Sequence, residues 1–337
     1  MTLPVIFGCL GTSLSDDEKT FFKKTQPLGF ILFQRNCESP DQVKALTDSM
    51  CALVNHDNVA VLIDQEGGRV ARLKPPHWRE YPTMETFGKL AMVCSQDAAT
   101  ALRLNCRLIA DDLRKIGVTV DCLPVLDLPQ SEANPIIGDR AFSDNPHLVG
   151  ALGRIAADAL AEGGVLPVIK HIPGHGRASV DSHKELPIVD ADYESLAAHD
   201  FVPFRALSDA PFAMTAHVKY LTLDTQHCAT QSATVIQDVI RDKIGFKGYL
   251  ISDDLSMEAL EGGFRKRTKL TMDAGCDIAL HCNGNMDEMI DIASVLEEAD
   301  SYMVEDISEL LLLASRQPMI DRAEDVAALD AILRSGL

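Results

Sequence analysis

Eight short runs rich in apolar and β-branched residues recur along the chain, separated by longer segments with helical periodicity. The runs occupy residues 5–9, 29–33, 59–63, 118–123, 166–169, 212–215, 248–251 and 277–280. Alternation of strands and helices predicts a parallel sheet, because parallel strands need crossover connections. Eight such units close a (β/α)8 barrel. The sequence therefore predicts an α/β fold of the TIM-barrel type, with a doubly wound open sheet as the alternative.

The segments between the runs support this fold. In six of them apolar residues recur at intervals of three and four, which is typical of a helix with one buried face. These segments are 41–55, 95–116, 146–162, 195–207, 234–244 and 286–297. Residues 321–337 carry a further apolar stripe. Because barrels of this length are single domains, we expect one domain over 1–337, with 321–337 as a C-terminal closing helix.

Composition excludes several classes of partner. The formal net charge is −19, with 31 Lys and Arg against 50 Asp and Glu, so a basic face for nucleic acid or an anionic membrane is not expected. The nine cysteines are scattered singly, which favours a reducing compartment over a disulfide framework or a metal knuckle. The N-terminus lacks a signal-like pattern and no run has the length of a membrane span. We expect a cytoplasmic protein with a small-molecule substrate and no obligate protein partner.

The fifth run ends in an unusual polar stretch. It reads KHIPGHG over 170–176 and continues to DSH over 181–183. A buried strand that breaks into basic residues, Pro and Gly delivers polar side chains into a loop. The loop is long and contains two glycines, so it is able to close over a ligand. We therefore expect a long catalytic loop after the fifth strand.

Polar residues also follow the other strands. In a barrel of this kind chemistry takes place at the C-terminal ends of the strands. The charged or imidazole side chains expected there are those of Asp64, Arg69, Arg140, Lys170, His171, His217 and Asp253.

Each of these residues also has a purely structural interpretation. An Asp after a strand often caps a helix, as Asp254 is placed to do, and a lone His such as His217 is more often a packing residue. Lys170 could pair with a carboxylate, and Arg69 or Arg140 could be solvated. The convergence of unlike charges in one cleft favours a functional site, because desolvating so many charges is costly.

This set of side chains suits a polyhydroxylated ligand, since each sugar hydroxyl both donates and accepts hydrogen bonds. Glycoside cleavage needs a carboxylate at the anomeric centre and an acid for the leaving oxygen. Asp253 can supply the first. Asp181 and His183 stand two apart, so in an extended stretch they would project to one side, and a carboxylate beside an imidazole favours the protonated ring. His183 could then act as the acid and Asp181 as its partner, although a loop-stabilising hydrogen bond is an equal alternative.

These motifs resemble those of the bacterial β-N-acetylglucosaminidases of glycoside hydrolase family 3, the NagZ type. The matching stretches are DQEGGRV over 64–70, KHIPGHG over 170–176 with DSH over 181–183, AHV over 216–218 and SDDLSM over 252–257, and they keep their order along the chain. The resemblance implies a retaining, exo-acting enzyme that releases terminal N-acetylglucosamine from muropeptides in cell-wall recycling.

The resemblance also implies roles for individual residues. Asp253 is the implied nucleophile, and Asp181 with His183 the acid/base pair. The residues implied to hold the sugar are Asp64, Arg69, Arg140, Lys170 and His171, with His217 nearby. No cofactor and no metal are implied. Two departures concern the wall of the site: Ile172 replaces the usual Phe, and Asp139 stands where Glu is expected.

Other functions remain open at the level of sequence. A phosphorolytic or broader-specificity β-glycosidase of the same family would use the same groups, because a His acid/base tolerates an incoming phosphate better than a carboxylate would. A metal-dependent amidohydrolase is a different class, but no His-x-His follows the first strand. A sugar-binding protein that has lost catalysis would not be expected to carry Asp181, His183 and Asp253 together.

Overall fold

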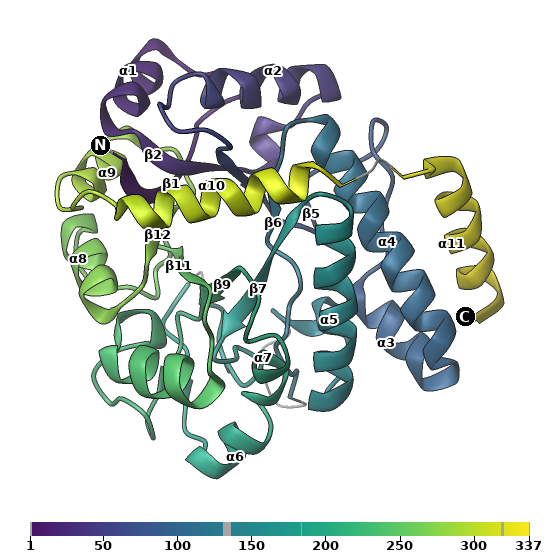
Figure 1. Ribbon diagram of the computed structural model, residues 1–337. Helices are drawn as coiled ribbons and strands as arrows, with labels where there is room; N and C mark the ends of the chain where they lie inside the picture. The colour runs from purple at the N-terminus through teal and green to yellow at the C-terminus, as the bar shows by residue number, and fades with distance from the viewer. Residues whose placement is uncertain (1, 131–135, 183, 318–319, 337) are drawn as a thin grey trace.

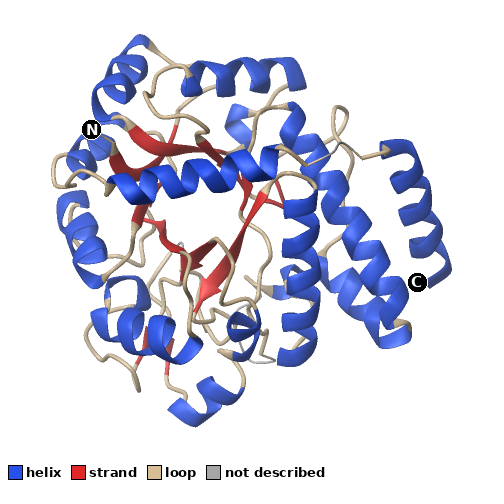
Figure 2. Ribbon diagram, viewed as in Figure 1, coloured by secondary structure: helices blue, strands red, loops and turns tan. Residues whose placement is uncertain are grey.

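The computed structural model describes residues 2–130, 136–182, 184–317 and 320–336. Eight parallel strands close into a barrel in the spatial order β1-β12-β11-β9-β7-β6-β3-β2, with helices around it (Figure 2). Their bounds are β1 (Leu3–Gly8), β2 (Pro27–Leu32), β3 (Ala60–Ile63), β6 (Val120–Asp121), β7 (Leu166–Ile172), β9 (Phe212–Thr215), β11 (Tyr249–Asp254) and β12 (Ile278–His281). Each predicted run contributes one of these strands, so the predicted barrel is confirmed and the open sheet is wrong.

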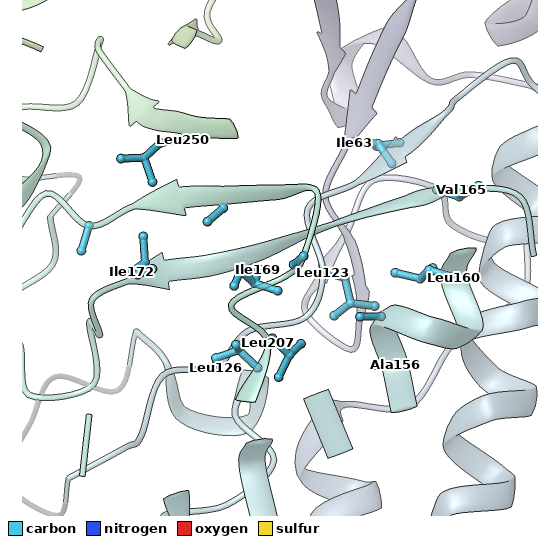
Figure 3. Packing of buried hydrophobic residues seen from close by; sticks show 14 of the residues in the cluster. Ile63, Leu123, Leu126, Ala156, Leu160, Val165, Ile169, Ile172, Leu207 and Leu250 are labelled. Carbon is cyan, nitrogen blue, oxygen red and sulfur yellow. The ribbon is translucent and has the colours of Figure 1, made fainter. Parts of the chain in front are cut away.

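Residues on the strands alternate between two apolar clusters. Ile6 and Ile31 belong to the cluster that fills the barrel, whereas Val5 and Phe7 belong to the cluster between the barrel and its helices. Figure 3 shows part of the outer cluster, which includes Ile169 of β7, Leu123 and Leu160. Because both faces of each strand are covered, the strand sequences are continuously apolar and do not alternate with polar residues.

The main helices of the outer layer follow the strands in the βα order expected of this barrel (Figure 1). They are α1 (Asp16–Thr25), α2 (Pro40–Cys51), α3 (Met84–Val93), α4 (Ser95–Lys115), α5 (Pro146–Glu162), α6 (Tyr193–Ala198), α7 (Val202–Ala206), the π-helical segment η4 (Val235–Ile244), α8 (Phe264–Ala274) and α9 (Met286–Ala293). Short 3-10 turns lie at η1 (Gln34–Asn36), η2 (Gly138–Arg140) and η3 (Ala229–Gln231).

Among the described residues, two small sheets lie outside the barrel. β4 (Gln65–Gly67) and β5 (Val70–Ala71) form an antiparallel hairpin after β3. β8 (Ile188–Val189) pairs in parallel with β10 (Lys219–Tyr220). Both sheets belong to the connections that follow barrel strands, so they shape the C-terminal mouth.

The helix predicted over 195–207 is interrupted, whereas those predicted over 41–55 and 286–297 only end earlier, at Cys51 and Ala293. Residues 195–207 do not form a single helix but contribute to α6 and α7, which are separated at 199–201. Pro203 lies in the first turn of α7, where its missing N–H is tolerated, whereas inside a continuous helix it would remove a hydrogen bond. The apolar residues keep their helical spacing across 199–201, so periodicity alone does not show that the helix is interrupted there.

Helix α10 (Ser301–Ser315) lies across the N-terminal end of the barrel (Figure 1). Met303, Ile307 and Leu311 belong to the same apolar cluster as the barrel interior. Tyr249 at the start of β11 donates a hydrogen bond to Asp306 Oδ2 at 2.7 Å. This helix therefore closes one end of the barrel and leaves the C-terminal mouth for ligands.

The C-terminal helix α11 (Arg322–Gly336) packs against α4, on the outside of the barrel (Figure 1). Leu329 is fully buried there, and Arg322 donates a hydrogen bond to Asp111 Oδ2 at 2.8 Å. The segment 321–337 stays as predicted a C-terminal closing helix of the single domain; in the described residues α11 covers α4, and α10 covers the N-terminal end of the barrel.

Of the described residues, none belongs to a helix that is both long and apolar enough to cross a bilayer.

Candidate active site

A pocket of about 320 Å³ opens at the C-terminal mouth of the barrel. Its charged and polar lining consists of Asp64, Arg69, Arg72, Arg140, Lys170, His171, His175, Ser182, Asp253 and Asp254. Its apolar lining consists of Ile31, Phe33, Val70, Ile136, Ile137, Met214, Met257, Leu280 and Cys282. A volume of this size with a few convergent polar groups suits one small polar ligand.

Asp64 directly follows β3 and lies between two cations. Its Oδ1 accepts a hydrogen bond from Lys170 Nζ at 2.7 Å, and its Oδ2 accepts one from Arg72 Nη2 at 2.8 Å. Burial alone would raise the pKa of Asp64, but Lys170 and Arg72 hold it well below its ordinary value. The carboxylate is therefore ionised and fixed in orientation.

Glu66 extends this cluster beneath the pocket. Its side chain is only 2% exposed, and it forms a bidentate pair with Arg140, whose Nε and Nη2 each lie 2.8 Å from a carboxylate oxygen. Glu66 Oε1 is also 2.7 Å from Lys170 Nζ. Although burial opposes ionisation, Arg140 and Lys170 lower the pKa of Glu66 to about 2. Sequence reasoning missed Glu66 as part of the site.

A tight hairpin brings a second missed residue, Arg72, back to Asp64. Gly67 and Gly68 take positive φ values of 100° and 56°, which favour glycine and turn the chain between β4 and β5. The Gln65 side-chain oxygen accepts hydrogen bonds from the Arg72 and Leu73 N–H groups at 2.9 and 3.0 Å. The Gly-Gly pair was the available signal, because a hairpin returns residues beyond the turn toward those before it.

Arg69 lies at the rim and serves a different role from Arg72. Its Nε donates to Asp139 Oδ1 at 2.9 Å, and its Nη2 donates to the carbonyls of Ile136 and Ile137 at 2.5 and 3.2 Å. These contacts hold the segment that carries Arg140. Arg69 lines the pocket, and these hydrogen bonds join it to the loop that carries Arg140.

Replacing Arg72 by Met is expected to lower kcat/KM more than replacing Arg69 by Met. A hydrogen bond to a charged group contributes about 1.5–3 kcal/mol, so the Arg72 variant should lose about 10- to 100-fold. Arg69 is 44% exposed and pairs with Asp139, which is 36% exposed, so its variant should lose less than about tenfold. Steady-state kinetics on one aryl glycoside measures both. A larger loss in the Arg69 variant would contradict this assignment.

His171, at the end of β7, is oriented by Asp127. Asp127 Oδ2 lies 2.7 Å from His171 Nδ1, and Asp127 Oδ1 accepts the His171 N–H at 3.2 Å. This contact occupies Nδ1 and leaves Nε2 as the ring nitrogen available to a ligand. Asp127 is fully buried, and burial would raise its pKa, but His171 lowers the pKa to about 2.

Asp127 should make stability depend on pH in the acid range. Because its pKa is lower in the folded state than in the unfolded chain, its stabilisation is complete above about pH 4 and is lost as the pH falls toward 2. The loss should be about 2 kcal/mol. Urea unfolding at a series of pH values should show a shallower decline between pH 4 and 2 for Asp127→Asn than for the wild type. An unchanged slope would contradict this assignment.

Asp253 and Asp254 end β11 but differ in their contacts. Asp254 Oδ1 accepts N–H groups from Ser256 and Cys282 at 2.9 and 3.2 Å, and Oδ2 accepts the Ser256 hydroxyl at 2.6 Å. These bonds satisfy groups of the turn after β11 and do not cap a helix, because α8 begins only at Phe264 with Gly263 as its N-cap. The helix cap expected of Asp254 is therefore wrong. Asp253 lines the pocket and its Oδ1 accepts the Asp254 N–H at 2.8 Å. The register of β11 with β12 shifts between Ile251 and Asp254, where the strand leaves the regular barrel.

The remaining predicted residues are placed differently. His217 is fully buried and is not among the described residues that line the pocket. Its Nδ1 lies 2.7 Å from Thr230 Oγ1 and its Nε2 lies 3.0 Å from the Asp254 carbonyl, so it supports the end of β11 as a packing residue does. Burial lowers its pKa. Ile172 is also fully buried in the outer core and is absent from the described pocket lining (Figure 3).

Asp181 accepts the hydrogen bonds of a turn, where an extended stretch was expected. The N–H groups of Lys184 and Glu185 both donate to the Asp181 carbonyl, at 2.9 and 3.2 Å. Ser182 lines the pocket, whereas Asp181 is not among its described lining residues. His183, the predicted acid, lies outside the described residues. Within the described ranges no three His, Cys, Asp or Glu side chains are grouped so as to hold a metal ion.

Comparison with known proteins decides the family. The profile of the glycosyl hydrolase family 3 N-terminal domain matches residues 6–309. The chain belongs to glycosyl hydrolase family 3. It is therefore a glycoside hydrolase, and the mouth described above is where members of this barrel class carry out their chemistry.

Individual proteins similar to this family 3 hydrolase are consistent with this family. It is 39% identical over 287 residues to a β-hexosaminidase of Alkalilimnicola ehrlichii, covering 83% of this chain and 80% of the relative. It is 37% identical over 288 residues to a β-hexosaminidase of Methylobacillus flagellatus, covering 84% and 81%. A crystal structure of NagZ from Neisseria gonorrhoeae in complex with N-trifluoroacetyl-D-glucosamine superposes with a TM-score of 0.87 at 30% identity, covering 100% of this chain and 98% of that one.

Proposed function

We propose that this hydrolase is a retaining, exo-acting β-N-acetylglucosaminidase with Asp253 as nucleophile and Asp181 with His183 as the acid/base pair. The observation that carries the proposal is that Asp253 and Ser182 line one pocket, since Ser182 is the chain neighbour of both members of the pair. Its β-hexosaminidase relatives and the similar structure that binds an N-acylated glucosamine support the substrate class.

The reaction follows from these roles. A carboxylate oxygen of Asp253 bonds to the anomeric carbon as the glycosidic bond breaks, and His183 gives its proton to the leaving oxygen. Water then attacks the anomeric carbon, gives a proton to His183, and releases Asp253. Asp64, Lys170, Arg72 and Arg140 hold the sugar hydroxyls, and their fixed ion pairs keep them from reorganising during the reaction.

The substrate that we propose is a muropeptide with a terminal β-linked N-acetylglucosamine, turned over in cytoplasmic cell-wall recycling. A pocket of about 320 Å³ has room for a single sugar, which fits exo action. The apolar wall that includes Phe33 and Met257 suits the less polar face of a sugar ring and its acetamido methyl group.

The test compares an aryl N-acetyl-β-glucosaminide with the matching aryl β-glucoside, without added metal or phosphate. We expect the first to be hydrolysed at least 100-fold faster in kcat/KM. A preference for the glucoside would overturn the acetamido specificity. A product that appears only with phosphate, as a sugar 1-phosphate, would replace hydrolysis by phosphorolysis.

The acid/base role makes a separate prediction about leaving groups. Replacing Asp181 or His183 by Ala should lower kcat/KM about 100- to 10⁴-fold for an unactivated disaccharide, because its leaving oxygen needs a proton. An activated aryl glycoside, whose leaving oxygen needs little protonation, should lose less than about tenfold in formation of the intermediate. Single-turnover kinetics with both substrates measures this difference. Equal losses would mean that the pair only shapes the loop.

A further inference from the structure

His175 and Ser182 join the barrel to the turn that begins at Asp181. Nε2 of His175 and Oγ of Ser182 are 3.0 Å apart and share a hydrogen bond. Each residue is only 3% exposed, and both line the pocket. The reaction proposed above uses neither side chain. A buried polar contact at the edge of the pocket therefore needs another explanation.

The His175 end of this contact is fixed to the barrel. Its N–H donates to Asp127 Oδ1 at 2.6 Å, and its ring packs edge-on against His171 with centroids 5.5 Å apart. The next residue, Gly176, lies so close to the Leu128 carbonyl that a Cβ would be only 1.9 Å from its oxygen. Arg177 Nε donates to Asp200 Oδ2 at 2.8 Å. The base of the loop is thus held at several points.

The Ser182 end of this contact lies next to Asp181, in the loop proposed to carry the acid/base pair. The Lys184 N–H donates to the Asp181 carbonyl at 2.9 Å, so Ser182 lies inside the turn that this bond closes. A side chain anchored within a tight turn fixes the backbone from which its neighbours project. Burial lowers the pKa of His175 to about 4, so the ring is neutral near pH 7 and does not compete for the role of a charged acid.

We propose that His175 and Ser182 are positioning residues whose hydrogen bond holds the Asp181 turn in the place from which the leaving oxygen is protonated. This rests on the proposed function of Asp181 and His183. The contact links a fixed part of the mouth, through Asp127 and His175, to the segment that carries the acid.

The test is Ser182→Ala, assayed with an unactivated disaccharide and with an activated aryl glycoside. We expect kcat/KM to fall about 10- to 50-fold for the disaccharide and less than threefold for the aryl glycoside, with the disaccharide loss in kcat and not in KM. Ser182→Thr keeps the hydroxyl and should recover most of the activity. Ser179→Ala replaces an exposed serine of the same loop and should leave both substrates unaffected.

A double-mutant cycle tests whether His175 and Ser182 act through one hydrogen bond. If they act through one hydrogen bond, His175→Ala with Ser182→Ala should lose no more than the larger single variant. His175→Gln serves in the cycle if the Ala variant does not fold. Equal losses of Ser182→Ala on both substrates, no loss, or additive losses in the cycle would overturn the proposal.

Asp181→Ala separates this proposal from the one on which it rests. If Asp181→Ala discriminates between the two substrates and Ser182→Ala does not, the positioning role is wrong and the acid/base pair stands. If Asp181→Ala itself loses activity equally on both, the acid/base assignment fails first.

Discussion

Replacing Asp253 by Ala is expected to lower kcat by about 10⁴- to 10⁶-fold, the scale seen when an enzyme loses its nucleophile or a directly coupled group. Asp253 is the carboxylate at the end of β11 that lines the pocket without serving as a turn cap. Steady-state kinetics with an aryl N-acetyl-β-glucosaminide measures the loss. Residual activity within 100-fold of the wild type would exclude Asp253 as the nucleophile.

The adjacent carboxylate offers a matched control. Asp254 accepts two backbone N–H groups and one hydroxyl, so Asp254→Asn keeps the shape of the side chain that holds this turn and should stay within about tenfold of the wild type in kcat. A 2-fluoro glycoside that traps the covalent intermediate should label the peptide at Asp253. Label on Asp254, or on neither residue, would contradict the assignment of Asp253 as the nucleophile, whatever the kinetics show.

Replacing Lys170 by Met is expected to lower the free energy of unfolding by about 3–5 kcal/mol, because it removes one partner from a buried ion-pair cluster. Lys170 Nζ lies 2.7 Å from Asp64 and 2.7 Å from Glu66, and its side chain is 2% exposed. Met keeps the length of the apolar stem, so the loss reports the charge and not a cavity. Urea unfolding near pH 7 measures it.

An exposed lysine supplies the comparison. Lys89 pairs with Glu85 at 2.8 Å on the surface of α3, and Lys89→Met should change stability by less than about 0.5 kcal/mol. The Lys170 variant should also recover part of its lost stability as the pH falls, because protonation of Asp64 or Glu66 then removes negative charge that Lys170 no longer balances. A Lys170→Met protein as stable as the wild type would mean that the cluster contributes no net stability.

The positions of several site residues could be predicted from the sequence, because they depend on which residues follow each strand along the chain. The eight apolar runs placed every barrel strand in order, and the residues at their C-terminal ends predicted that Asp64, Lys170, Arg140 and Asp253 share one mouth. The structure does bring these four together around the pocket. The reasoning works because parallel strands of a barrel all end on the same side.

Other features depend on the exact path of the loops. The hairpin through Gly67 and Gly68 decides which arginine contacts Asp64. It brings Arg72 back to Asp64 and leaves Arg69 at the rim of the pocket. Glu66 looked like any other charge near a turn, and only the approach of Arg140 from a distant loop turned it into a buried partner. Long-range pairing of this kind leaves no local pattern in the sequence.

By itself the sequence determined the strand order, the barrel and the set of charged groups available at its mouth, because periodicity and chain order are local properties that the fold preserves. The tertiary structure decided how those groups are paired: Lys170 between two carboxylates, His171 turned by Asp127, and His217 withdrawn into the core behind β11. Pairing was beyond the sequence because burial sets the cost of each unpaired charge, and burial is known only once the loops have packed.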